Sequence, residues 1–401
     1  MYKQILKQTG DSWDNISRRI FGTPERAGDF EKLNSSTLGD KVIVFEPKPE
    51  TEEETSGMSL SPDGERSRSR NEGVYIEIGE TIYKDFSEYT LIDSLGGIKA
   101  GIFVFLCTDE NVNSFRFNQA VKVYDENGVF LEGRIANVKS IRNENTTHIQ
   151  IEVKSNAGIL IESVVPYPLE FANQSIQQIL TTIAGYYGLD IEFDEEGITE
   201  EIFTNEIGTS YSAKIDETTF QFMYRICSSR GLILHDTGTA LKVFKLNAEI
   251  LEKINFIEGE CIGINSIRTD FIGDNLARYY EVNSQYPLTG STVVTTPYPM
   301  PITKRLNSND LNAKNIEEIA QRLACREIGK HFSLNIELTD NFSIKSGDIA
   351  VVKQTAVQIP AETDFVIEQA IRINPDIMSL TLTLPCVYTG ILPETLPLCN
   401  V

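Results

Sequence analysis

The alternation of apolar and polar residues divides the chain into regions of different structure. From residue 73 to residue 166, apolar and β-branched residues recur with a period of two, which is typical of strands that bury one face. Asn127-Gly128 lies between two such runs and predicts a hairpin in which 121–124 pairs with 129–135. A β-barrel or a strongly curved sheet is expected in this region.

Helical spacing appears between residues 167 and 250, where we expect a mixed α/β domain. Ser175 is the predicted N-cap of a helix that Gly188 ends, and a strand over 189–193 follows. The apolar stripe of this helix consists of Ile176, Ile179, Leu180, Ile183 and Tyr187.

Residues 211–244 contain a second helix and a hairpin in direct succession. Asp216 is the predicted N-cap, Gly231 ends the helix, and two short strands flank residues 236–238. The apolar positions at helical spacing are Phe220, Met223 and Cys227, with Phe222 and Ile226 in a second row.

A second β-rich region covers residues 251–401. One amphipathic helix over 316–329 interrupts it, with Ile316, Ile319, Leu323 and Ile328 as the predicted buried face. A turn at Lys345-Ser346-Gly347-Asp348 precedes a strand, and alternating strands are expected over 365–373 and 379–385.

The first 72 residues differ from the rest. Residues 1–46 predict a small β-α-α-β unit, with strands at both ends and Gly22 ending the first helix. Residues 47–72 are rich in Pro, Ser, Glu and Gly and contain few apolar residues. Because such a segment cannot bury enough surface to offset its loss of conformational entropy, we interpret it as a flexible linker.

The helix, glycine stop and hairpin of residues 211–244 resemble the helix-hairpin of the late-control protein D and Mu-type hub family of contractile phage tails. The Gly347-Asp348 turn and its strands resemble the last barrel of that family. The resemblance implies an α+β, mainly β, multidomain protein with two tube-like β-barrel domains, over 73–166 and 251–401, and a mixed α/β domain between them.

The first 46 residues resemble a LysM module. The positions that match its pattern are Gly10, Asp11, Ser12, Trp13, Ile16 and Asn34. In soluble proteins the resemblance implies binding of N-acetylglucosamine polymers such as peptidoglycan, whereas in tail baseplates LysM-like modules resemble clamps between neighbouring proteins. Trp13 does not decide between these readings, because a tryptophan at this position also fits the module's core.

The net charge of -22 and the isoelectric point near 4.6 argue against binding of nucleic acid, which depends on Lys and Arg at phosphates. Such a charge suits the wall of a channel through which DNA slides, and it also suits plain solubility. The six cysteines have no paired spacing, which indicates reduced, buried thiols and assembly in a cytoplasm. No signal peptide or membrane span is expected.

Candidate chemistry is sparse. His148, His235 and His331 are far apart in sequence, without a metal-ligand motif, and no G-x-S-x-G occurs. The acidic pairs Glu195-Glu196 and Glu200-Glu201 would suit a glycosidase only if two carboxylates came to a suitable separation, and as loop acids they need no such role. We expect no enzyme activity, no cofactor and no metal.

The function implied by the resemblance is that of the central hub of a contractile tail baseplate. Three copies would form a ring that adapts the six-fold tail tube to the three-fold spike, with an acidic channel through which DNA passes unbound. The implied partners are a second and third copy, the tube protein, the trimeric spike, and wedge or sheath-initiator proteins through the LysM-like module. The protein would belong to the virion, assembled in the host cytoplasm. A cell-wall-binding or wall-degrading tail protein, or a secretion-system spike component, are the alternatives.

Overall fold

The computed structural model describes residues 2–6, 41–45, 73–107, 115–142, 147–194, 198, 200–205, 210–246, 253–259, 263–284, 290–308, 316–339, 343–373 and 377–398. Contacts within the chain separate a unit of residues 1–67 from a unit of residues 68–401. In the first unit, β1 (Tyr2–Leu6) and β2 (Lys41–Phe45) pair antiparallel. They occur where the sequence predicts the outer strands of the β-α-α-β unit. The two predicted helices and the LysM motif residues lie outside the described residues.

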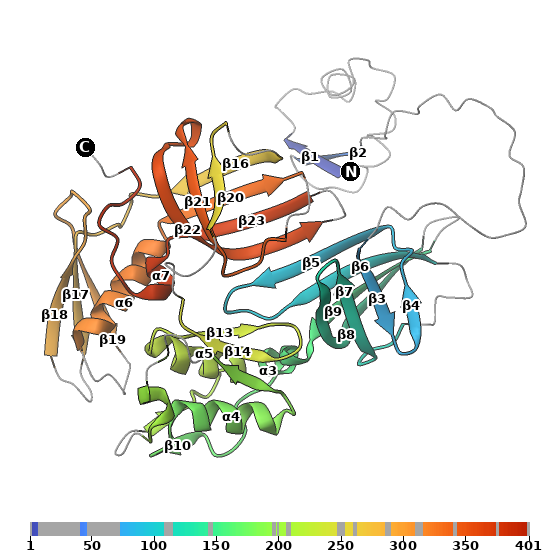
Figure 1. Cartoon of the computed structure of the whole chain (residues 1–401), viewed down its shortest axis with the longest axis horizontal. Helices are drawn as coiled ribbons and strands as arrows, with labels where there is room; N and C mark the ends of the chain where they lie inside the picture. Colours follow the sequence, from blue (N-terminus) through green and yellow to red (C-terminus); the bar gives the residue numbers. More distant parts are fainter. Residues whose placement is uncertain are drawn as a thin grey trace, which may run out of the picture. The chain divides into compact units, whose positions relative to one another are not determined.

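The second unit is mainly β and contains a sheet of 13 strands that curls as it runs (Figure 1). Its first seven strands are β3 (Tyr75–Ile78), β4 (Thr81–Tyr83), β5 (Glu88–Ser94), β6 (Ala100–Cys107), β7 (Ala120–Asp125), β8 (Gly128–Arg142) and β9 (Thr147–Ser155). The other six are β15 (Lys253–Ile257), β16 (Ile264–Phe271), β20 (Phe332–Leu338), β21 (Ile349–Gln354), β22 (Ile359–Ile373) and β23 (Ile377–Thr383). All neighbours in it pair antiparallel except β15 and β21, which are parallel.

The sheet is built from two repeats with the same strand order. The first repeat reads β5-β6-β9-β8-β7-β3, and the second reads β16-β20-β23-β22-β21-β15. Both repeats continue into a short helical segment, η1 and α3 (Asn156–Gly158 and Ile159–Glu162) after β9, and α7 (Cys386–Thr389) after β23. The two β-rich regions of the sequence therefore share one strand order, although β3 is antiparallel to β7 and β15 is parallel to β21.

The longest strands of the two repeats match in detail. β8 and β22 each have 15 residues, and each pairs with one neighbour in its first part and with another in its second part. A bulge interrupts each strand, at Ala136 in β8 and at Glu368 in β22. Since a bulge bends its strand, both repeats curl at the same place. Aligning the bulges equates residue 136 with residue 368, which sets the correspondence between the repeats.

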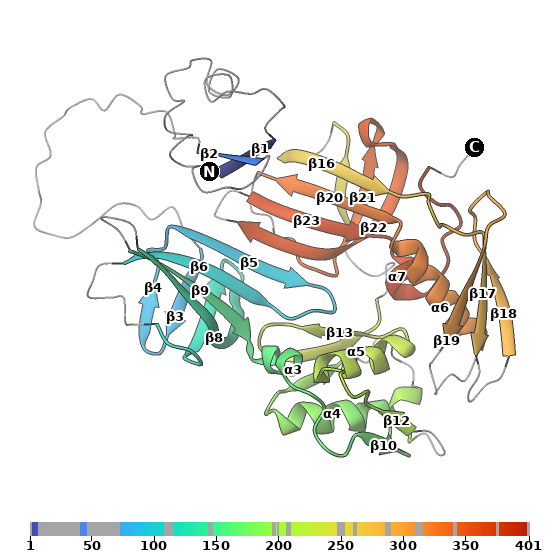
Figure 2. The same cartoon turned by 180° about the vertical axis from the view of Figure 1, so that it is seen from behind.

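The two barrels predicted from the sequence are not separate sheets. β5 of the first repeat pairs antiparallel with β22 of the second, so one sheet passes through both (Figure 2). Each repeat nevertheless has its own hydrophobic core. The Asn127-Gly128 hairpin is confirmed, with Gly128 at a φ of 113°. The turn at Gly347-Asp348 is confirmed too, directly before β21.

The middle domain links the repeats. It contains β10 (Glu170–Ala172), α4 (Ile176–Tyr186), β11 (Ile191–Phe193), η2 (Glu200–Phe203), β12 (Ser210–Ser212), α5 (Thr219–Ser229), β13 (Ile233–Asp236) and β14 (Leu241–Phe244). Its two helices, packed on each other through their predicted apolar stripes, form a core of their own. The predicted glycine stops are confirmed: Gly188 and Gly231 both adopt a φ of 69° just after the helices.

The N-cap of α4 is predicted correctly and that of α5 is not. Ser175 caps α4 in a reciprocal box with Gln178. The cap of α5 is Thr218, two residues after the predicted Asp216, and it exchanges hydrogen bonds with Gln221. Thr218 is favoured because its hydroxyl and the Gln221 amide together satisfy two backbone N–H groups.

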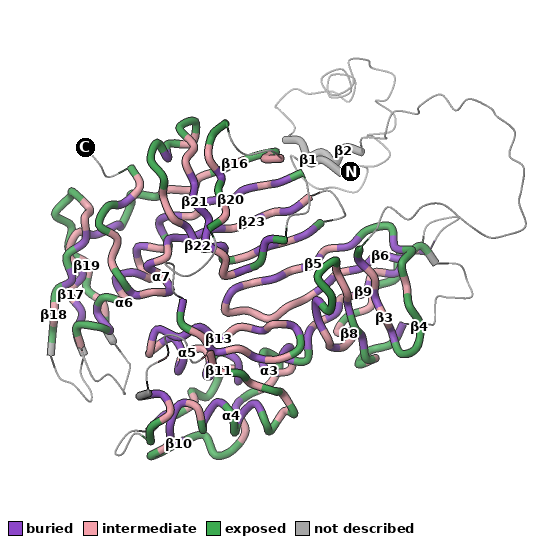
Figure 3. The backbone as a smooth tube through the Cα atoms, viewed as in Figure 1, coloured by how far each residue is buried: buried purple, intermediate pink, exposed green. Residues whose placement is uncertain are grey.

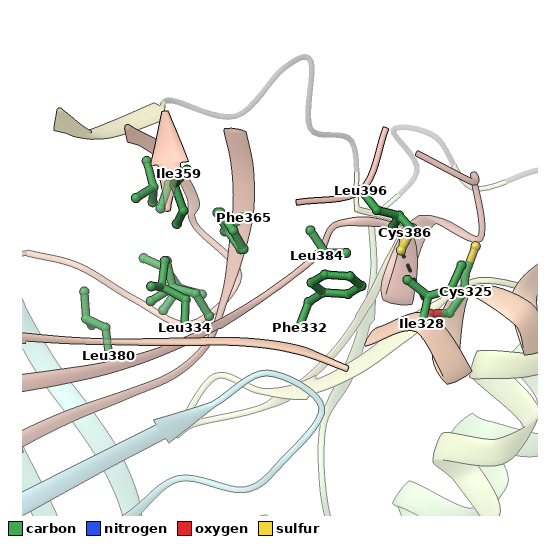
Figure 4. Close-up of a cluster of buried hydrophobic side chains, with 14 of the residues drawn as sticks. Cys325, Ile328, Phe332, Leu334, Ile359, Phe365, Leu380, Leu384, Cys386 and Leu396 are labelled. Carbon is green, nitrogen blue, oxygen red and sulfur yellow. Dashed lines mark hydrogen bonds between the residues drawn. The ribbon is translucent and has the colours of Figure 1, made fainter. Parts of the chain in front are cut away.

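The second repeat has an insertion between β16 and β20 that the sequence predicts only in part. The predicted helix is α6 (Ile316–Gly329), but a separate sheet of β17 (Tyr279–Ser284), β18 (Gly290–Thr295) and β19 (Thr303–Ser308) accompanies it. α6 buries Ile319 and Ile328 as predicted, together with Ala320, Ala324 and Cys325, while Ile316 and Leu323 are half-buried. Figure 4 shows Cys325 of α6 and Cys386 of α7 in the core next to Phe332.

Candidate assembly interface

The pairing of β5 with β22, which we call the seam, joins the repeats. It creates a run of eight neighbouring strands, β16-β20-β23-β22-β5-β6-β9-β8. Successive side chains of a strand point to opposite faces, and burial alternates accordingly along these strands (Figure 3). One face packs on the cores of the repeats. The other, which we call the open face, consists of half-buried and exposed side chains along most of its length.

The seam itself is a backbone ladder with a polar side-chain bond beside it. Its register runs from Gln369 opposite Ser94 to Ile373 opposite Thr90, and the Gln369 amide donates to the Ser94 hydroxyl at 2.9 Å. The N–H of Leu95 donates to the carbonyl of Glu368, the bulge residue of β22, at 2.7 Å. The bulge therefore contributes directly to the joint between the repeats.

Two strand edges of the eight-strand run have no partner among the described strands. β16 lies at one end and pairs only with β20. At the other end, residues 137–142 of β8 pair with β9 on one side only, because the pairing of β8 with β7 stops at Arg134. Ile141 in this stretch is 57% exposed. Unpaired edges of this kind are ready templates for pairing with another chain.

The open face carries few charges. Among the described residues, its charged side chains include the acidic Glu88, Glu152, Asp270 and Glu337 and the basic Arg134, Lys139, Lys154 and Arg268. Its other side chains are mostly Ser, Thr, Asn, Gln and half-buried Ile. The charge of this face is therefore close to balanced, although the whole chain carries -22. The acid excess of the protein is located elsewhere.

The hairpin of the middle domain is anchored in the first repeat through the turn between β13 and β14. Asp236, which is 1% exposed, accepts hydrogen bonds from the N–H of Lys99 at 2.8 Å and from the hydroxyl of Ser155. The carbonyl of Gly238 accepts from the N–H of Glu132 at 2.8 Å. Because the Asp236 carboxyl group is buried and bonded several times, it fixes the position of the hairpin.

A second buried carboxylate, Asp93 of β5, lies where the two repeats and the middle domain meet. It accepts a hydrogen bond from the N–H of Ser346 at 3.2 Å, and its other oxygen is 3.9 Å from Nε2 of His235. Burial lowers the pKa of His235, and the nearby Asp93 only partly opposes this effect. The lowered pKa favours the neutral imidazole at neutral pH.

The residues singled out in the sequence do not gather at one place. His148 lies in β9, His235 in β13 and His331 just after α6, and the described residues include no cluster of three or more His, Cys, Asp or Glu that could hold a metal ion. Cys227, Cys325 and Cys386 are buried thiols, as predicted. Among the described helices, none is long and apolar enough to cross a membrane.

Sequence reasoning missed the seam and the two open edges. The residues that form them, such as Gln369, Ser94 and Val138, belong to ordinary alternating strands and carry no local signal. An internal alignment of the two 15-residue strands and their hairpins is the signal that could have exposed the repeat.

No protein-family model and no curated protein matches the sequence. Solved structures match it along most of its length. A 43 kDa tail protein of prophage MuSo2 from Shewanella oneidensis has a TM-score of 0.66 at 15% identity, covering 79% of this chain and 99% of the other. A tail protein from Neisseria meningitidis MC58 has a TM-score of 0.66 at 14% identity, covering 79% and 98%. A prophage tail protein, gp18, from Listeria monocytogenes has a TM-score of 0.55 at 12% identity, covering 78% and 94%. The chain shares the fold of these phage tail proteins.

Proposed function

We propose that the chain is the central hub of a contractile tail baseplate, in which three copies close into a ring. The observation that carries this proposal is the pair of like-ordered repeats, joined edge to edge, with a matching open edge at each end. The shared fold with phage tail proteins supports the setting. The protein is then structural, part of the virion, and has no catalytic role.

The seam within one copy predicts the seam between copies. Within the copy, β5 pairs with the second part of β22. The equivalent of β5 in the second repeat is β16, and the equivalent of that part of β22 is residues 137–142 of β8, which are the two open edges. A head-to-tail contact between copies would therefore join β16 of one to β8 of the next, and closure of such contacts yields a ring.

The correspondence also predicts the register of this contact. Ala370 opposite Asp93 within the copy becomes Val138 opposite Phe271 between copies. Both of these side chains are half-buried against the cores of their repeats, so pairing would extend each core. Ile371 opposite Ile92 becomes Lys139 opposite Asp270, which places opposite charges across the contact.

A ring of three copies contains six repeats. The six repeats would match a hexameric tail tube on one side, and the three copies would match a trimeric spike on the other. The open face would then line the channel. Because the charge of this face is close to balanced, the wall of the proposed DNA channel would be near neutral and not strongly acidic. The first unit would act as a clamp that binds wedge or sheath-initiator proteins. Residues 47–72 would be the linker that connects this clamp to the rest of the chain.

Charge reversal at the predicted contact tests the ring. Light scattering of the full chain over a concentration series should show a trimer for the wild type, and a shift toward monomer for Lys139→Glu and for Asp270→Lys. A cross-strand charge pair contributes roughly 0.2–1 kcal/mol, and a ring contains three such pairs. The double variant has the wild-type net charge and should recover the trimer. A mass that does not respond to the single variants, or no recovery in the double variant, would contradict the proposed contact.

A further inference from the structure

A groove in the second repeat has a counterpart in the first repeat. Its volume is about 1330 Å³. Its walls are the start of β22, the end of β23 with α7, α6, and the segment 390–398. The lining residues used below are Glu362, Thr363, Asp364 and Leu384.

The same place in the first repeat holds the tip of the middle-domain hairpin. By the bulge alignment, Phe130 and Glu132 of β8 correspond to Glu362 and Asp364 of β22. Glu132 donates its N–H to the carbonyl of Gly238 in the hairpin. Ser155, at the end of β9, corresponds to Leu384 and donates to Asp236 of the same hairpin. In the first repeat a hairpin tip therefore fills this place, whereas in the second repeat it is a groove.

The backbone of β22 directs one N–H into the groove, and no described backbone group accepts it. Ile367 exchanges hydrogen bonds with residues 347 and 348, on the side of β21. Because N–H groups alternate in direction along a strand, those of Phe365 and Thr363 also point to β21, and that of Asp364 points to the opposite side, into the groove. This is the direction in which Glu132 donates to the hairpin in the first repeat.

The two grooves differ in polarity at one position. Leu384 replaces Ser155, so the hydroxyl that binds Asp236 in the first repeat has no counterpart at the equivalent position of the second groove. Among the charged residues that line it, Asp364 pairs with Lys253 at 2.7 Å, Glu362 with Lys353 at 3.8 Å, and Glu318 with Arg322. Leu384 therefore favours an apolar residue where the hairpin has Asp236.

We propose that this groove binds a β-turn of a partner protein. The turn carries glycine at its tip and an apolar residue two positions earlier, and one of its carbonyl groups accepts the N–H of Asp364. Glycine is required because a Cβ at Gly238 would lie 2.1 Å from the carbonyl oxygen of Phe130 in the first repeat, and Glu362 occupies the equivalent position. This inference rests on the internal repeat and does not depend on the proposed ring.

A cyclised peptide tests the proposal directly. The probe is the 12-residue hairpin of residues 233–244 with Asp236→Leu, closed by a terminal disulfide and titrated into the full chain by fluorescence anisotropy. We expect saturable binding of this peptide and at least roughly tenfold weaker binding, or about 1.4 kcal/mol, when it also carries Gly238→Val. Equal binding of the two peptides, or no binding of the first, would overturn the proposal.

Two variants of the protein separate the backbone donor from the side chain. Asp364→Pro removes the N–H that points into the groove, and proline is tolerated on an exposed strand edge. Asp364→Ala retains the N–H and removes only the carboxylate. We expect Asp364→Pro to weaken peptide binding about five- to tenfold, the effect of one hydrogen bond, and Asp364→Ala to bind like the wild type. Circular dichroism verifies that both variants are folded, and equal losses in both would refute the assigned donor.

Discussion

Gly238 is a residue of the middle domain whose backbone lies directly against β8 of the first repeat. Its φ of 97° lies in the region that favours glycine, and its backbone faces the carbonyl of Phe130. Gly128, in the turn between β7 and β8, has a similar φ of 113° but no heavy atom within 4 Å of the position of a Cβ. A comparison of the two glycines therefore distinguishes the effect of backbone strain from the effect of close approach.

Alanine at these two positions should have different costs. Gly128→Ala introduces only backbone strain, of about 1–3 kcal/mol. Gly238→Ala adds an overlap with Phe130 that the hairpin must relieve by moving, which costs about 1–3 kcal/mol more. Denaturant titration measures both free energies of unfolding. Equal losses would mean that the hairpin tip is not held against β8.

His235 should make the stability of the protein depend on pH. Burial lowers its pKa below the ordinary 6.5 in the folded state, so as the pH falls below 6.5 the unfolded chain binds a proton before the folded chain does. Stability is therefore retained above this pH and lost on acidification. Between pH 7.5 and pH 5.5, the melting temperature of the wild type should fall more than that of His235→Gln. Parallel curves for the two proteins would rule out this histidine as the sensitive group.

At the scale of elements, local signals predicted helices and tight turns well. Ser175 with Gln178 and the glycines at 188 and 231 act within a few residues, and so they can be read from the chain. Asp216 was a wrong choice of cap although Thr218 and Gln221 form the T-x-x-Q pattern of a capping box. That pattern was available in the sequence, and it specifies a helix start better than a lone acidic residue does.

The pairing of the repeats was beyond local reasoning. The bond between Gln369 and Ser94 joins residues 275 positions apart, and the strands that contain them alternate like many others. Their partner is selected by the curl of the whole sheet and the position of its bulges. For the same reason the open edges of β16 and β8, which form the candidate interface, could not be found from the sequence.

At the scale of the whole molecule, the division at residue 67 predicts that the second unit folds alone. Contacts within residues 68–401 define it as a compact unit. A protein that starts at residue 68 should therefore unfold with the same melting temperature as the full chain in scanning calorimetry. The ring proposed above should also persist in it, since both open edges belong to this unit. A truncated protein that aggregates or melts more than a few degrees lower would contradict the division.

The joining of two repeats in one chain also bears on the entropy of association. Six independent repeats would need five encounters to close a ring, each opposed by about 4–15 kcal/mol of lost translational and rotational freedom. Three fused pairs need only two encounters, because the seam between β5 and β22 is already formed when the chain folds. Weak edge contacts, of a strength that single strands can supply, would then suffice to hold the ring.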